Sequence, residues 1–230
     1  MNAYIIVEGS ETEPSVYPAW LSVLAPRMQR IEDATKVSKN NYYLFSAHGI
    51  PSIFKHTANA IADINAINQS APGMYDYLIV CLDTEEETRD YIEKKIQEQV
   101  DLLNVELKDT QLLIFEQKVC METWFLGNRK VFKSNPQGKE MIKFLQHYNV
   151  KTDNPEDMDT MDADLYNKAQ FHVRYLKRML EERNMSYSKN NTEVVCTEDY
   201  LEELIKRYEE SNHISTFGSW YEFVRDNLNK

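Results

Sequence analysis

The chain has 230 residues, which is enough for one large or two small domains with a real hydrophobic core. Its hydrophobic content of 42%, with only 6 glycines and 7 prolines, excludes a disordered chain, and no apolar run approaches the roughly 18 residues of a membrane span. The net charge of -11 excludes tight binding to nucleic acid unless a local basic patch, a bound metal or a partner supplies the attraction.

The compartment follows from the start of the sequence and from the cysteines. No basic segment followed by an apolar one opens the chain, so we expect no secretory signal and no membrane contact. The chain has three cysteines, Cys81, Cys120 and Cys196, and neither their odd number nor their spacing suggests disulfide pairs. We therefore expect reduced thiols in a cytoplasmic protein.

The first half of the chain alternates between apolar runs and amphipathic segments. Residues 4–7 form a short β-branched run that predicts a buried strand, and a helix is expected from Pro14 to Leu24. The polar stretch 27–41 is expected to be a connection. A second strand over 42–45 and a helix over 54–67 follow.

Two further strands complete the predicted sheet. They cover residues 76–82 and 110–115, with a helix over 85–103 between them. Strands that alternate with helices predict an α/β fold, a Rossmann-like, parallel four-stranded sheet flanked by helices. A strand order of 2-1-3-4 would place the first and third strands side by side. This α/β domain is expected to span residues 1–134.

The remainder of the chain, residues 135–230, is expected to form a helical extension that serves as a lid or docks a partner. Helical patterns begin just before it and continue through it, over 121–132, 137–148, 164–184, 200–211 and 217–228.

Carboxylates stand where the first and third predicted strands end. Glu8 follows the first strand, and Asp83 and Glu85 follow the third. Parallel strands gather their chemistry outside their carboxyl ends, and crowded carboxylates are stabilised by a divalent cation with oxygen ligands, Mg²⁺ or Mn²⁺. The alternative for each acid is a cap on the helix that follows, since acids are favoured in a first helical turn.

These motifs resemble a known fold. The segment Val7-Glu8-Gly9-Ser10-Glu11-Thr12-Glu13-Pro14, followed later by the strand that ends in Asp83-Thr84-Glu85, resembles the TOPRIM fold of topoisomerases, primases and certain nucleases. Together with Cys120-Met121-Glu122-Thr123-Trp124, it is similar to RloB-like proteins and to the TOPRIM half of OLD (overcoming lysogenization defect) nucleases. The resemblance covers roughly the first 130 residues. One departure is Glu85, where many members have Asp.

The resemblance implies residue roles and a biological setting. It marks Glu13 and Glu122 as site residues beside the metal ligands Glu8, Asp83 and Glu85, and it implies metal-dependent cleavage of DNA or RNA. It also implies a bacterial antiphage defence component that acts with a partner ATPase. The rival interpretations are a non-catalytic module that binds a nucleotide or partner through Mg²⁺, and nucleotidyl transfer of the primase type. Oligomeric state stays open.

The helix predicted over 164–184 offers a candidate nucleic-acid surface. Arg174, Tyr175 and Arg178 are expected on one face, where guanidinium groups would neutralise phosphates and the ring would stack on a base. The alternative is an ordinary charged surface. The preceding run 153–164 carries six acids and no base, so we expect a solvated loop that repels nucleic acid.

Overall fold

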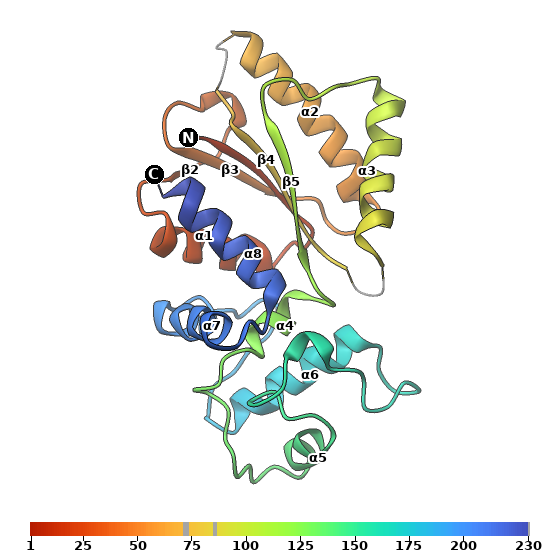
Figure 1. Cartoon of the computed structure of the whole chain (residues 1–230), viewed down its shortest axis with the longest axis vertical. Helices are drawn as coiled ribbons and strands as arrows, with labels where there is room; N and C mark the ends of the chain where they lie inside the picture. The colour runs from red at the N-terminus through yellow and green to blue at the C-terminus, as the bar shows by residue number, and fades with distance from the viewer. Residues whose placement is uncertain (71–73, 85–86, 230) are drawn as a thin grey trace. The chain divides into compact units, whose positions relative to one another are not determined.

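The computed structural model describes residues 1–70, 74–84 and 87–229, which group into two compact units (Figure 1). The first unit comprises residues 1–82, 87–116 and a C-terminal stretch that starts at Glu222. The second comprises Asp83, Thr84 and Gln117–Tyr221. The predicted boundary between residues 134 and 135 does not coincide with this division, since the second unit is inserted into the first.

The first unit is an α/β structure built on one five-stranded sheet. Its strand order is β2-β3-β1-β4-β5, and β1 pairs in parallel with both β3 and β4. The strands are β1 (Ala3–Val7), β2 (Gln29–Ile31), β3 (Asn41–Ser46), β4 (Tyr77–Asp83) and β5 (Gln111–Gln117). The four predicted strands therefore occur in the predicted order, with the first and third side by side.

The predicted number of four strands is wrong because the sequence analysis missed β2. Its three residues are exposed or half-buried, so they carry no alternating apolar pattern. The strand exists because it pairs with β3 at the edge of the sheet, with Gln29 opposite Asn41. Pairing of this kind depends on a distant segment, which local residue types do not reveal.

Helices cover both faces of the sheet in the first unit (Figure 1). On one face, α2 (Ser52–Ser70) and α3 (Arg89–Leu103) pack together over alternate residues of β1 and β4. This core includes Tyr4, Ile6, Leu78, Val80 and Leu82 from the strands and Ile53, Ile61, Ile64, Ile92 and Ile96 from the helices.

The opposite face of the sheet is covered by α1 (Thr12–Leu24) and the last residues of the chain. The buried side of α1 carries Val16, Tyr17, Trp20 and Leu21. The chain then ends in α8 (Ser215–Phe223) and the π-helical turn η3 (Val224–Leu228). The Phe223 ring lies 5.1 Å from the ring of Tyr77 and 5.3 Å from that of Phe115, centre to centre. Phe223, near the end of the sequence, thus packs against the sheet of the first unit.

The second unit is mainly helical. Its helices are α4 (Met121–Phe125), α5 (Lys139–His147), α6 (Lys168–Glu181), α7 (Glu198–Ser211) and the first part of α8, with a short η2 (Pro155–Asp157). Capping side chains define where α6 and α7 begin: the Asn167 side chain accepts from the Gln170 amide, and the Thr197 hydroxyl accepts from the Tyr200 amide.

Among the described residues, no helix has both the length and the apolar character that crossing a membrane requires.

Candidate functional site

The backbone of Glu8 is fixed at the carboxyl end of β1. Its N–H donates to the Cys81 carbonyl of β4 at 3.0 Å, and its carbonyl accepts from the Gly49 amide at 2.9 Å. Val7, the residue before it, stands opposite Cys81 in the parallel register. Glu8 is half-buried. The first unit therefore holds this acid where β1 leaves the sheet, as the sequence predicts.

Glu13 shapes the loop that carries Glu8. Its side chain is only 6% exposed, and its Oε1 accepts the Gly9 amide at 2.8 Å. A Cβ atom on Gly9 would lie 2.5 Å from that oxygen, so glycine is required for this close approach. Glu13 thus binds the backbone of the loop between β1 and α1, a role the sequence analysis did not assign to it.

The charge of Glu13, on α1, acts on the Cys81 thiol of β4. The pKa of the Cys81 thiol is raised to about 12: burial is the main cause, a hydrogen bond with Tyr17 opposes it, and the nearby Glu13 carboxylate adds a smaller increase. Asp83 lies two residues beyond Cys81 on the same strand. Because alternate residues of a strand share a side, Asp83 projects from the same side of β4 as Cys81.

In the second unit, Asp83 and Glu122 act on a common neighbour. The Cys120 thiol is fully buried, and its pKa is raised by burial first and then by the charges of Glu122 and Asp83. Glu122 is 2% exposed and accepts the Tyr187 hydroxyl at 2.8 Å. The structure therefore supplies the partner that a buried glutamate needs, and it brings two of the predicted site acids near one another.

The structure describes two of the three proposed metal ligands, Glu8 and Asp83. Glu85 lies outside the described residues. Within the ranges that the structure describes, no group of three or more His, Cys, Asp or Glu side chains is placed to hold a metal ion. The donors that the sequence proposes are all carboxylate oxygens, which is the ligand chemistry that Mg²⁺ and Mn²⁺ prefer.

The predicted exposure of Tyr175 is wrong. Tyr175 is fully buried, and its hydroxyl donates to the Tyr148 carbonyl. The core-facing residues of α6 include Phe171, Tyr175 and Leu176, whereas Leu165 precedes the helix and is 64% exposed. The buried side of α6 thus carries aromatic and aliphatic residues together, and its rings bury a large apolar surface. Tyr175 therefore offers no surface for stacking on a base.

Arg174 and Arg178 do lie toward solvent, and both contact one carboxylate. The Nε atom of Arg174 lies 2.5 Å from Glu140 Oε1, and that of Arg178 lies 2.6 Å from Glu140 Oε2. Partial burial raises the pKa of Glu140, but the hydrogen bonds from both guanidinium groups outweigh this and lower it overall. The sequence analysis missed Tyr166, Lys177 and Lys189, which line a groove beside these arginines. For Lys177 the available sequence signal was its place between Arg174 and Arg178, within about one turn of the helix.

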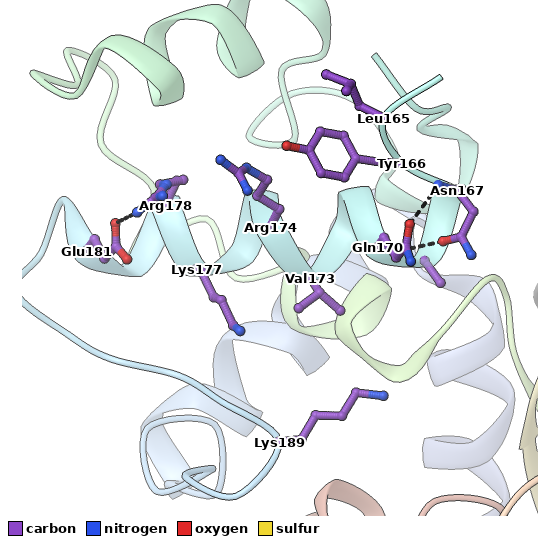
Figure 2. Close-up of a pocket in the computed structure, with 11 residues that line it drawn as sticks. Leu165, Tyr166, Asn167, Gln170, Val173, Arg174, Lys177, Arg178, Glu181 and Lys189 are labelled. Atoms are coloured by element: carbon purple, nitrogen blue, oxygen red, sulfur yellow. Dashed lines mark hydrogen bonds and ion pairs between the residues drawn. The ribbon is translucent and has the colours of Figure 1, made fainter. Parts of the chain in front are cut away.

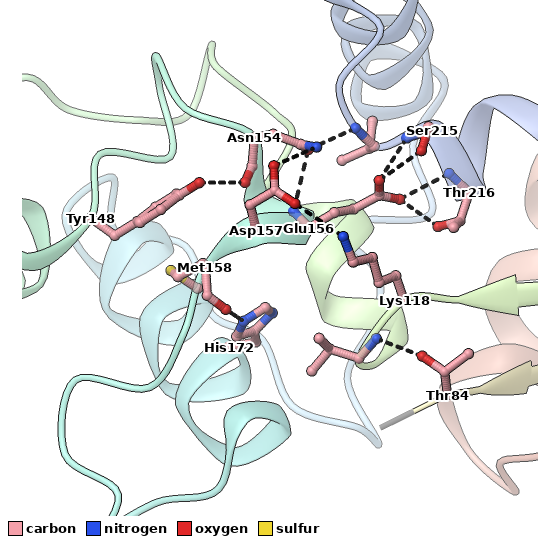
Figure 3. A network of polar contacts seen from close by, with 12 residues as sticks. Thr84, Lys118, Tyr148, Asn154, Glu156, Asp157, Met158, His172, Ser215 and Thr216 are labelled. Atoms are coloured by element: carbon pink, nitrogen blue, oxygen red, sulfur yellow. Dashed lines mark hydrogen bonds and ion pairs between the residues drawn. The ribbon is translucent and has the colours of Figure 1, made fainter. Parts of the chain in front are cut away.

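The acidic run 153–164 is not simply a solvated loop. Glu156 is 4% exposed, and its two carboxylate oxygens accept the backbone amides and the hydroxyls of Ser215 and Thr216 at the start of α8 (Figure 3). The adjacent Asp157 pairs with Lys118 at 3.0 Å. A carboxylate on a helix N-terminus is favoured by the helix dipole and by the exposed amides. Part of the run therefore stabilises the second unit.

His172 belongs to the same unit and has a structural role. Its Nε2 lies 2.9 Å from the Met158 carbonyl (Figure 3), which can only accept, so Nε2 carries the proton. Nδ1 then accepts from the Thr123 hydroxyl at 2.8 Å. Burial lowers the pKa of His172 to about 4. The imidazole is therefore neutral at pH 7.

Comparison of the chain with models of protein families, with curated proteins and with solved structures found no match.

Proposed function

We propose that this protein is a divalent-metal-dependent nuclease of the TOPRIM type. One observation carries the proposal: β1 and β4 are adjacent, parallel strands at the centre of the sheet, and the chain places Glu8 directly after one and Asp83 at the end of the other. Carboxylates at the ends of neighbouring parallel strands are placed where open α/β sheets gather their chemistry.

The carboxylates have distinct roles in this proposal. Glu8, Asp83 and Glu85 hold Mg²⁺ or Mn²⁺, and Glu122, positioned by the Tyr187 hydroxyl, orients water near Asp83. Glu13 is a positioning residue, because it binds the Gly9 amide and so fixes the loop that follows β1. A bound divalent ion would supply positive charge to a phosphodiester as negative charge develops on it.

The proposal extends to a setting. A protein with a net charge of -11 gains little from its overall electrostatics when it meets DNA or RNA. A partner ATPase, as the resemblance implies for a bacterial defence system, would contribute further nucleic-acid contacts. Cleavage by the isolated chain should then be slower than cleavage by the chain mixed with such a partner.

The test is cleavage of end-labelled DNA and RNA with Mg²⁺, with Mn²⁺ and with a chelator. Asp83→Asn should lower cleavage by about 100-fold or more, since even outer-shell partners of metal ligands are worth about 10–100-fold each. Asp90→Asn is the matched control: Asp90 is an exposed acid in the first turn of α3 and is not one of the proposed metal ligands. It should leave cleavage unchanged.

Each outcome of this assay has a defined meaning. Full activity of Asp83→Asn, or activity in chelator, would refute the proposal. Metal-dependent retention of the oligonucleotide without shortened product would support the non-catalytic binding module. Products longer than the substrate would indicate nucleotidyl transfer.

A further inference from the structure

A groove runs along the solvent side of α6 and over the segment that precedes this helix (Figure 2). Its volume is about 700 Å³, and all of its lining residues belong to the second unit. Four of them are cations, contributed by Arg174, Lys177, Arg178 and Lys189. Such a concentration of positive charge is unusual for a chain with a net charge of -11.

The cations in this α6 groove outnumber the acids beside them. Glu140 is shared by two guanidinium groups, and Glu181 pairs with Arg178 only. Lys177 forms no ion pair with any carboxylate in the described part of the chain. Three cations of α6, Arg174, Lys177 and Arg178, against these two carboxylates leave a net positive surface, so the α6 groove is complementary to a polyanion.

The α6 groove also has an aromatic and apolar component. The guanidinium carbon of Arg174 lies 5.2 Å from the centre of the Tyr166 ring, and Figure 2 shows the two side chains next to one another beside α6. Leu165 and Val173 add apolar surface, and Leu165 is 64% exposed. Planar bases stack on such rings and guanidinium planes, which a paired base inside a duplex cannot do.

We propose that the α6 groove binds single-stranded nucleic acid, with the phosphates on Arg174, Lys177, Arg178 and Lys189 and a base against Tyr166. The choice of nucleic acid as the polyanion rests on the proposed nuclease function. Charged phosphates together with unpaired bases match both components of the groove, whereas an acidic peptide matches the cations alone. In this arrangement the α6 groove holds the strand, and the proposed carboxylate site cleaves it.

The test separates binding from cleavage. Fluorescence anisotropy in chelator measures binding of labelled oligothymidylate and oligouridylate, about 12 nucleotides long, within the usual range for single-strand sites. Lys177→Glu should weaken binding by about tenfold, because it replaces an attraction by a repulsion, and should reduce the slope of log K against log salt by about 0.7 or more. Lys206→Glu, an exposed lysine on α7, is the matched control and should change neither.

Two further measurements keep the proposal open to refutation. Tyr166→Leu should weaken binding of the single strand by about tenfold while the salt slope stays constant, since it removes stacking and no charge. A duplex of the same length and a polyglutamate peptide should bind more weakly than the single strand. Equal effects of Lys177→Glu and Lys206→Glu, preference for the duplex, or equal binding of polyglutamate would each overturn the assignment of the groove.

A small chromogenic substrate distinguishes this inference from the nuclease proposal. Hydrolysis of bis(p-nitrophenyl) phosphate with Mn²⁺ needs the metal ligands but no strand-binding groove. Lys177→Glu should therefore leave it unchanged, and Asp83→Asn should abolish it. Normal binding of oligothymidylate with no hydrolysis in the wild type would refute the nuclease and retain the groove, while hydrolysis without oligonucleotide binding would do the reverse.

Discussion

The contact between Gly9 and Glu13 offers a sharp test of how the loop after β1 is built. Glu13 is buried and accepts the Gly9 amide at 2.8 Å, a hydrogen bond to a charged group that is worth about 1.5–3 kcal/mol. In Gly9→Ala the new methyl carbon would lie 2.5 Å from Glu13 Oε1 and 2.6 Å from Cδ, so the carboxylate must move away. We expect the free energy of unfolding to fall by about 1.5–3 kcal/mol in this variant.

A double-mutant cycle makes the argument refutable. Glu13→Ala should lower the free energy of unfolding by a similar amount, since it removes the same hydrogen bond. With the carboxylate gone, Gly9→Ala should cost less than about 0.5 kcal/mol, because Gly9 does not adopt a positive φ. Urea denaturation followed by circular dichroism gives the four values. Additivity of the two single changes to within about 0.5 kcal/mol would show that they do not act through one contact.

Two predictions concern the second unit. Glu156→Ala should lower the free energy of unfolding by about 3 kcal/mol, since it strips the α8 N-terminus of a buried acceptor for two amides and two hydroxyls, and a loss below about 1 kcal/mol in urea denaturation would contradict this. Because burial lowers the pKa of His172 to about 4 in the folded state, the unfolded chain binds more protons between that pH and about 6.5. The contribution of His172 to the free energy of unfolding is therefore fully present above about pH 6.5 and should fall by about 3 kcal/mol on acidification to about pH 4. If a His172→Gln variant loses stability with the same dependence on pH over this range, His172 is excluded as the source.

The strand order could be predicted because each buried strand carries its own signal. Residues 4–7 and 77–82 are continuous apolar runs, as expected for strands that are covered on both faces, and a right-handed crossover allows few arrangements of them. The edge strand at 29–31 lacks such a signal because its three side chains are exposed or half-buried and therefore need not be apolar.

Side-chain environments in the helical unit were harder to predict. Tyr175 lies between Arg174 and Arg178 along the sequence of α6, and only the packing of its ring against Phe144 and Phe171 shows that it faces the core. Likewise, Glu156 looks like its acidic neighbours in the sequence. Its burial follows from Ser215 and Thr216, about 60 residues later, which no local pattern connects to it.

The candidate acids at the strand ends could be recognised because each follows its predicted strand directly in the sequence. Glu8 and Asp83 lie at ends of adjacent strands, as the sequence predicts, and Glu122 is buried beside the Tyr187 hydroxyl. The loop-binding role of Glu13 could not be predicted from spacing, since it depends on the absence of a Cβ atom on Gly9.

The return of the last residues to the sheet determines how the α/β unit can be isolated. A fragment that stops at residue 134 would lack Phe223, and the aromatic surface of Tyr77 and Phe115 would be exposed to water. Excising residues 117–221 and joining the flanking segments with a short flexible linker would preserve that packing. A researcher who wishes to crystallise the sheet alone should therefore design an internal deletion instead of a C-terminal truncation.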